Sequence, residues 1–162
     1  MSVKIEIHPG DVLASGAPII AHQVNCKGVM GAGVAKAIKK KYRSVYNDYR
    51  KLCVEKGAAL MGETQFVWTA DRTVVANCFA QNEFGIGSRQ TDYDAFRSCM
   101  SKLCDFAKKK GVWRIAMPYK IGCGLAGGNW DIVQKIIAEE FEWYTGTVEF
   151  WSIDLKPDGP HS

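Results

Sequence analysis

The sequence has no C-x-x-C pair among its six cysteines, and its three histidines lie far apart along the chain. Zinc sites are built from closely spaced ligands of these types, so we expect neither a metal ion nor a cofactor. There is also no apolar run of the length that spans a membrane, and residues 1–6 lack the apolar stretch of a signal peptide. We therefore expect a cytoplasmic protein with free thiols and no membrane partner.

The composition is that of an ordinary globular protein. The chain has 162 residues, of which 47% are hydrophobic and 23% charged, which is enough for one domain with a full core. No internal repeat or linker divides the sequence. We predict a single domain over residues 1–155, followed by a flexible C-terminal tail over residues 156–162, and we expect a monomer.

The formal net charge of +4 raises the question of a nucleic-acid partner. Much of the basic charge lies in two lysine runs, 39–41 and 108–110, and each run closes a predicted helix. Cations at a helix C-terminus offset the helix dipole, and Gly111 after the second run is a typical C-cap residue. This structural explanation outweighs a nucleic-acid patch, so we do not expect nucleic acid as a partner.

The most informative stretch is a glycine loop that follows a buried strand. The apolar run 18–21 leads into three glycines within 28–33, and residues 34–42 have the pattern of a helix. The free N–H groups of a helix N-terminus favour a phosphate there, with a plain tight turn as the alternative. Two common nucleotide motifs do not fit. Val34 stands where a P-loop needs its lysine, and Lys36 replaces the third small residue of a dinucleotide fingerprint.

The other periodicities predict an α/β domain. Apolar runs indicate strands at 3–8, 17–25, 62–69, 73–80, 112–119 and 147–153. Helical patterns cover 34–42, a segment that starts with Ser44 as its N-cap, 92–110, and the stretch from Asn129 to Tyr144. The order β-β-α-α-β-β-α-β-α-β is typical of a three-layer α-β-α sandwich with a central mixed β-sheet. In such sheets ligands bind at the carboxyl ends of the strands.

A second glycine loop covers residues 120–128 and has four glycines in nine residues. Such a loop contributes little to a core, and its backbone N–H groups suit an anion. Like the first loop it follows a strand and opens a helix, so the two loops could hold the two phosphates of one diphosphate. Cys123 is a candidate nucleophile in this loop, because a helix N-terminus lowers the pKa of a thiol. No histidine lies near it in the sequence, which favours a small packing residue instead.

These motifs occur in the order found in one known family. Gly10-Asp11-Val12, Asn25, Gly31-Ala32-Gly33-Val34-Ala35 and Ile121-Gly122-Cys123-Gly124-Leu125 resemble the successive signatures of a macrodomain. Each motif is weak alone, but the ordered set covers nearly the whole chain, with the expected strands and helices in between. Within the family the chain is most similar to the compact branch that contains terminal ADP-ribose–protein glycohydrolase and the yeast ADP-ribose 1''-phosphate phosphatase.

The resemblance implies an ADP-ribose site. Asp11 would accept from the adenine amino group beside Val12, Asn25 would contact the distal ribose, and Ile153 would flank the adenosine. The backbone of both glycine loops would hold the diphosphate. The residues implied to bind are Asp11, Val12, Asn25, Gly31, Ala32, Gly33, Val34, Lys120, Ile121, Gly122, Cys123, Gly124, Leu125, Ala126 and Ile153. The structural alternatives are a turn or capping carboxylate for Asp11 and an amide that pins its loop for Asn25, and the ordered set of motifs favours the ligand over either alternative.

Whether the protein turns over a substrate is left open by the sequence. In the glycohydrolase that this family contains, a lysine attacks the ribose and an aspartate assists, and Gln81 and Ala126 stand at the matching positions here. Neither can do that chemistry. His22 matches a histidine of the phosphatase branch, where it would be an acid or base near neutral pH, or else the structural end of a buried strand.

We therefore predict a macrodomain that binds ADP-ribose or one of its derivatives, with ADP-ribosylated protein as a further candidate partner. The favoured function is an enzyme that acts at the distal ribose, either as an ADP-ribose 1''-phosphate phosphatase or as an ADP-ribosyl ester hydrolase. The alternative is a module that reads ADP-ribose without turnover.

Overall fold

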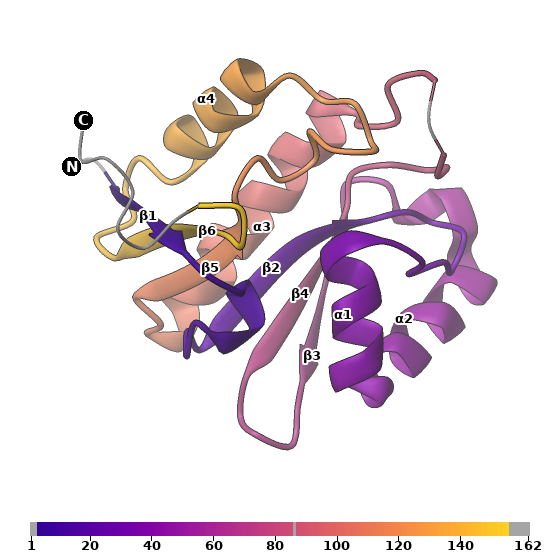
Figure 1. Ribbon diagram of the computed structural model, residues 1–162, viewed down its shortest axis with the longest axis horizontal. Coiled ribbons are helices and arrows are strands. Elements are labelled where there is room, and N and C mark those ends of the chain that lie inside the picture. The colour runs from indigo at the N-terminus through magenta and orange to yellow at the C-terminus, as the bar shows by residue number, and fades with distance from the viewer. Residues whose placement is uncertain (1–2, 86, 156–162) are drawn as a thin grey trace.

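The computed structural model describes residues 3–85 and 87–155 of the chain. Six strands form one sheet in the order β1-β6-β5-β2-β4-β3 (Figure 1). Neighbouring strands are parallel, except that β3 runs antiparallel to β4, so the sheet is mixed as predicted. The strands are β1 (Lys4–Pro9), β2 (Ile19–Val24), β3 (Thr64–Trp68), β4 (Val74–Phe79), β5 (Arg114–Pro118) and β6 (Thr147–Ser152). The helices are α1 (Gly33–Lys41), α2 (Arg43–Lys56), α3 (Tyr93–Lys110) and α4 (Trp130–Glu140), with short 3-10 turns η1 (Val12–Ala14) and η2 (Gly57–Leu60).

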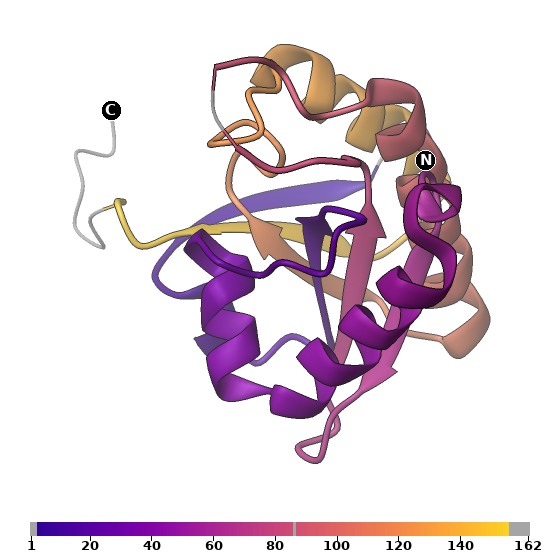
Figure 2. The same cartoon turned by 90° about the vertical axis from the view of Figure 1, so that its right-hand side faces the viewer.

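The helices cover the sheet on both faces. Helices α3 and α4 lie on one side, and α1 and α2 lie on the other (Figures 1 and 2). Each helix pair shares a buried apolar cluster with the sheet face beneath it. The predicted three-layer α-β-α sandwich and the predicted order of elements are therefore confirmed.

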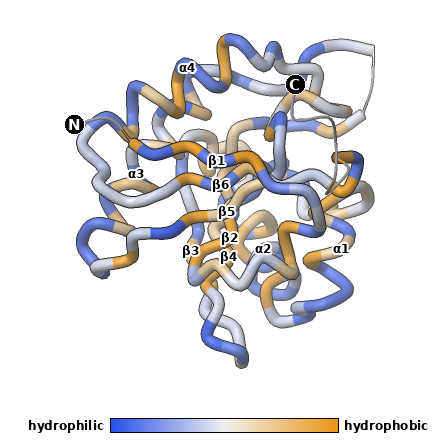
Figure 3. Tube along the Cα trace, turned by 60° about the vertical axis from the view of Figure 1, so that its left-hand side comes forward, coloured by the Kyte–Doolittle hydropathy of each residue, from blue (hydrophilic) through white to orange (hydrophobic). Residues whose placement is uncertain are grey.

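The alternation of side chains along the central strands explains the two clusters. In β2, Ile19 and Ala21 pack with α3 and α4, whereas Ile20 and Val24 pack with α1 and α2. All six residues of β4 are buried. A strand covered on both faces is mostly apolar, with Asn77 as the polar exception in β4, and the tube is largely orange where the central strands are labelled in Figure 3.

Three sequence expectations differ from the structure or lie outside it. Helix α2 begins at Arg43 with Tyr42 as its N-cap residue, so Ser44 is inside the helix rather than capping it. Helix α4 ends at Glu140 and does not reach Tyr144, whose hydroxyl instead donates to the carbonyl of Val112. The proposed tail over 156–162 lies outside the described residues. Along the described chain, no helix has both the length and the apolar character that a membrane crossing requires.

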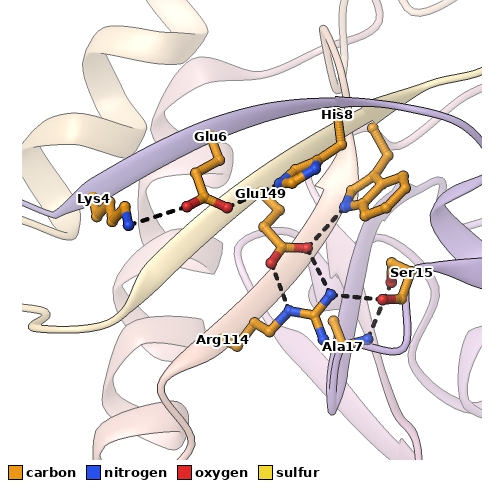
Figure 4. A network of polar contacts seen from close by, with 8 residues as sticks. Lys4, Glu6, His8, Ser15, Ala17, Arg114 and Glu149 are labelled. Carbon is orange, nitrogen blue, oxygen red and sulfur yellow. Dashed lines mark hydrogen bonds and ion pairs between the residues drawn. The ribbon is translucent and has the colours of Figure 1, made fainter. Parts of the chain in front are cut away.

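An ion pair between Arg114 and the buried Glu149 ties β5 to β6 (Figure 4). The Nε and Nη2 atoms of Arg114 lie 2.5 Å and 3.1 Å from the carboxylate of Glu149, and Arg114 also donates to the carbonyl of Ser15. The indole of Trp151 donates to the same carboxylate. Glu149 is only 4% exposed, so these donors replace the water that its charge has lost.

Candidate functional site

The fold brings the candidate residues to one edge of the sheet. Five of the six strands are parallel, so the segments that follow them meet at their common carboxyl edge. Asp11 follows β1, Asn25 follows β2, Gln81 follows β4, the loop 120–128 follows β5 and Ile153 follows β6. Residues that are more than 100 positions apart in the sequence thus share one side of the molecule.

The first glycine loop ends on the N-terminus of α1. The amide groups of residues 31–35 donate no hydrogen bond within the described part of the chain. Ala32 occupies the N-cap position and has no side-chain acceptor to offer, and the first turn of α1 carries no acidic residue. By contrast, Asp92 and Asn129 cap α3 and α4 with their side chains. The N-terminus of α1 therefore presents unpaired donors and the positive end of a helix dipole.

The second glycine loop offers a further set of donors. The amide groups of Gly122, Gly124 and Leu125 donate no hydrogen bond to an acceptor in residues 3–85 or 87–155. Lys120 begins this loop with a φ of +59°, in the left-handed region that residues other than glycine rarely adopt. Local strain of this kind costs on the order of 1–3 kcal/mol and concentrates at functional sites.

Two adjacent cavities lie between the loops. The first has a volume of about 230 Å³ and is called the α1 cavity here; it is lined by His22, Gln23, Ala32, Gly33, Val34, Ala35, Gln81, Pro118, Lys120, Ile121, Gly122, Gly124, Leu125 and Ala126. The second, called the Phe84 cavity, has a volume of about 410 Å³ and is lined by Gln23, Val24, Asn25, Val29, Gly31, Ala32, Ala35, Gln81, Phe84, Gly85, Leu125 and Ala126. Six lining residues are shared, so the two cavities adjoin each other.

Gln23 organises the junction of the two cavities. Its Nε2 atom donates to Oε1 of Gln81 and to Oγ1 of Thr91, each at 2.8 Å. Thr91 in turn donates to the carbonyl of Gly122 at 2.7 Å. The Oε1 atom of Gln23 is buried and accepts no hydrogen bond within the described chain. Because buried polar atoms are rarely left unpaired, this oxygen is a candidate contact for a ligand or a water molecule.

Asn25 does pin its own loop. Its Nδ2 atom donates to the carbonyl of Val29 at 2.8 Å, and its Oδ1 atom accepts from the amide of Lys27 and the hydroxyl of Tyr49. Asn25 also lines the Phe84 cavity. Asn25 therefore pins its loop, as the structural alternative from the sequence stated. It can also contact a ligand, because it lines the Phe84 cavity.

The residues implied for adenine lie apart from the two cavities. Asp11 accepts from the amide of Leu13 at 2.9 Å and so caps η1. Val12 is buried in the core beneath α1 and α2, and Ile153 is 77% exposed. None of the three lines the α1 cavity or the Phe84 cavity. The adenine end of the site remains a proposal that rests on the resemblance and on the shared sheet edge.

His22 lines the α1 cavity but is 2% exposed. Burial lowers its pKa from the ordinary 6.5 to about 4, and the hydrogen bond to Asn77 acts in the opposite direction. The expectation that His22 titrates near neutral pH is therefore wrong, and its ring is neutral at pH 7. The sequence shows that a histidine ends a strand, but the desolvation that shifts its pKa follows only from packing in three dimensions.

Cys123 does not have the surroundings of a nucleophile. Burial raises the pKa of its thiol to about 11, and the thiol lies against the carbonyl of Ile121. Cys123 lines neither the α1 cavity nor the Phe84 cavity, although its neighbours on both sides in the loop line the first of them. The side chain instead packs against the core beneath α3 and α4, in agreement with the packing role that the sequence favoured.

Sequence reasoning missed Gln23, Phe84 and Thr91. Gln23 occupies an alternating position at the end of β2, and Thr91 and Phe84 belong to a polar segment with no recognisable motif. One further cluster consists of Glu6, His8 and Glu149, whose ligand atoms lie within 4.8 Å of one another. Glu149 is already neutralised by the guanidinium of Arg114, so this set is a poor fit for a cation.

Comparison with known proteins gives consistent matches. The family model described as Macro domain matches residues 21–137. ADP-ribose 1''-phosphate phosphatase of Candida albicans is 26% identical over 151 residues, which cover 83% of this chain and 92% of that protein. DNA ADP-ribosyl glycohydrolase of Mycobacterium tuberculosis is 25% identical over 136 residues, which cover 82% of this chain and 37% of that longer protein. A solved structure of a protein of unknown function from Bacteroides thetaiotaomicron is 30% identical, with a TM-score of 0.80 and coverage of 93% of this chain and 99% of that chain.

Proposed function

This chain belongs to the macrodomain family, and on that basis we propose that it binds ADP-ribose between its two glycine loops. The diphosphate occupies the α1 cavity, and the distal ribose extends into the Phe84 cavity. The adenosine then lies towards the carboxyl ends of β1 and β6, where Asp11 and Ile153 follow the strands.

One observation carries this proposal. Unpaired amide groups of residues 31–35 and of Gly122, Gly124 and Leu125 belong to the two loops that border the same cavity, and Lys120 is among its lining residues. Backbone donors and one cation suit a group with several acceptor oxygens and negative charge, such as a diphosphate. A neutral ligand would leave these donors without strong acceptors.

We also propose that the protein processes an ADP-ribose derivative at the distal ribose. The similar proteins include one named a phosphatase of ADP-ribose 1''-phosphate and one named a glycohydrolase of ADP-ribosylated DNA. A phosphate monoester or an ADP-ribosyl ester is therefore the substrate class that we favour, and ADP-ribosylated DNA is the third substrate to test. A lysyl adduct is disfavoured, because Gln81 and Ala126 replace the lysine and aspartate that the glycohydrolase resemblance requires.

In this proposal His22 is the catalytic residue, and it acts as a neutral group. With a pKa of about 4 its ring is uncharged at pH 7, so it can accept a hydrogen bond or a proton but cannot act as an imidazolium general acid. Gln23 adds a second buried acceptor at the junction of the cavities. Together they would orient a water molecule or a ribose hydroxyl.

A reader module without turnover is the second candidate, and the Phe84 cavity favours it. The polar side chains that line this cavity in the described chain are the amides of Gln23, Asn25 and Gln81. Uncharged amides bind hydroxyl groups well, but they neither give up nor take up a proton near pH 7. Such a pocket can recognise a ribose without breaking its bonds.

A turnover assay separates the two candidates. The purified protein is incubated with ADP-ribose 1''-phosphate, with a peptide carrying an ADP-ribosylated glutamate, and with an ADP-ribosylated DNA oligonucleotide. Release of phosphate or of ADP-ribose, lost in His22→Ala, supports the enzyme. Tight ADP-ribose binding with no product from any of the three substrates supports the reader. A lysine–ribose adduct trapped by borohydride contradicts the role given to His22.

A further inference from the structure

A ladder of polar side chains crosses three neighbouring strands beneath α1 and α2. His22 on β2 is in register with Asn77 on β4, and Asn77 is in register with Gln65 on β3. Val75 and Phe79, on either side of Asn77 along β4, pack in the core cluster of α1 and α2, so Asn77 shares that face. His22 and Asn77 are therefore surrounded by apolar side chains, whereas Gln65 is half-buried at the outer end of the ladder.

The three side chains are joined end to end. The Nε2 atom of His22 lies 2.6 Å from Oδ1 of Asn77, and the Nδ2 atom of Asn77 donates to Oε1 of Gln65 at 3.0 Å. Asn77 is fully buried, and His22 is 2% exposed. A buried amide among apolar neighbours costs stability unless it is hydrogen-bonded, and this one spends both of its polar atoms on its two neighbours in the ladder.

The direction of this ladder decides which ring nitrogen of His22 carries hydrogen. We propose that Asn77, held by Gln65, is a positioning residue that keeps His22 as the Nε2–H tautomer and leaves the Nδ1 lone pair for the α1 cavity. An amide oxygen only accepts, so the nitrogen facing Oδ1 must donate. The Nδ1 atom is buried and has no hydrogen-bond partner in the described chain, while His22 lines the α1 cavity.

This inference rests on the proposed function for its consequence, but the tautomer itself does not depend on it. In the ADP-ribose complex, Nδ1 accepts a hydrogen bond from a water molecule or a hydroxyl group in the α1 cavity. The neutral ring makes this possible, since burial favours the uncharged form. If the side-chain amides of Asn77 and Gln65 both had their nitrogen and oxygen atoms exchanged, Nδ1 of His22 would carry the hydrogen. His22 would then offer the α1 cavity a hydrogen-bond donor instead of an acceptor.

The test is nitrogen-15 NMR of the imidazole groups in the free protein at pH 7. The chain has only three histidines, so a His22→Gln variant assigns the signals of His22 directly. We expect Nε2 in the protonated range and Nδ1 in the unprotonated range. The reverse pattern, or a rapid average of the two tautomers, overturns the proposal.

Variants along the ladder test whether Asn77 and Gln65 set the tautomer. In Gln65→Glu the carboxylate at neutral pH still accepts a hydrogen bond from Asn77, so the Nε2–H tautomer of His22 should be preserved. In Gln65→Leu this acceptor is lost, Asn77 can flip, and the nitrogen signals of His22 should move towards an average of the two tautomers. Asn77→Leu removes the acceptor and should shift it further. An unchanged tautomer in a folded Asn77→Leu protein contradicts the proposal. If Asn77→Leu does not fold, the comparison of Gln65→Glu with Gln65→Leu, at a half-buried position, tests the same claim. Identical His22 signals in these two variants would contradict the proposal.

Ligand addition then tests the consequence separately. On titration with ADP-ribose, the Nδ1 signal of His22 should move as it accepts a hydrogen bond, and kcat in Asn77→Leu should fall by roughly tenfold or more with KM little changed. If ADP-ribose does not bind, the proposed function fails while the tautomer stands. If ADP-ribose binds and the Nδ1 signal stays in place, the role of the lone pair in the cavity is wrong.

Discussion

A Cβ atom added to Gly122 would lie 2.7 Å from Oε1 of Gln23, closer than side-chain contacts allow. Gly122 also has a φ of +76°, a conformation that favours glycine. A side chain at position 122 would therefore strain the backbone and push the end of the Gln23 side chain aside. Gly124, two residues further on, has open space around the same position and an ordinary φ.

The two glycines should consequently respond differently to alanine. Gly122→Ala should lower the free energy of unfolding by about 1–3 kcal/mol, since it adds backbone strain and displaces Gln23 from Gln81 and Thr91. Gly124→Ala should change it by less than about 0.5 kcal/mol. Urea denaturation measures both variants, and equal effects would show that the contact with Gln23 does not constrain the loop.

Stability should depend on pH through His22. The pKa of His22 is about 4 in the folded protein, against the ordinary value of 6.5 in the unfolded chain. Between pH 4 and pH 6.5 the unfolded chain therefore binds one more proton than the folded protein does. Stability from this group is complete above pH 6.5 and falls by up to about 3 kcal/mol as the pH drops to 4. In His22→Gln the slope over this window should flatten. A slope that stays the same in the variant would mean that His22 is accessible to protons in the folded state.

The pair of Arg114 and Glu149 should show strong coupling. Arg114→Met leaves a buried carboxylate with Trp151 as its remaining donor, and we expect a loss of roughly 2–4 kcal/mol. Glu149→Gln in the same background removes the charge and should restore part of that loss. A double-mutant cycle in urea measures the coupling, and strictly additive effects would contradict the importance of the pair.

Cys123 should be unreactive and dispensable for the site. Its pKa of about 11 leaves few thiolate molecules at pH 7.5, so alkylation by iodoacetamide should be slower than that of a free cysteine peptide. Cys123→Ala should keep the ADP-ribose affinity of the parent protein within about twofold, about 0.4 kcal/mol. Rapid alkylation that also abolishes turnover would return Cys123 to the list of candidate nucleophiles.

The sequence was sufficient for the elements, because periodicity records which face of a strand or helix is buried. It predicted β2 within one or two residues at each end and identified both glycine loops. It did not reveal the polar contacts between distant segments: Gln23 meets Thr91 across 68 positions, and His22 meets Asn77 across 55. Burial of His22 and the unpaired oxygen of Gln23 follow from those contacts, so the local pattern could not give them.

The central claim is that the two glycine loops hold a diphosphate, and calorimetry on Gly124 variants tests it most directly. Gly124 lines the α1 cavity and has room for a side chain, so Gly124→Glu and its matched control Gly124→Gln can be made without backbone strain. We expect the parent protein to bind ADP-ribose much more tightly than AMP. Gly124→Gln should weaken ADP-ribose binding moderately, and Gly124→Glu should weaken it at least tenfold further, because its carboxylate repels the phosphates. Equal ADP-ribose affinity in the glutamate and glutamine variants, both with native-like unfolding curves, would place the diphosphate elsewhere and contradict the account.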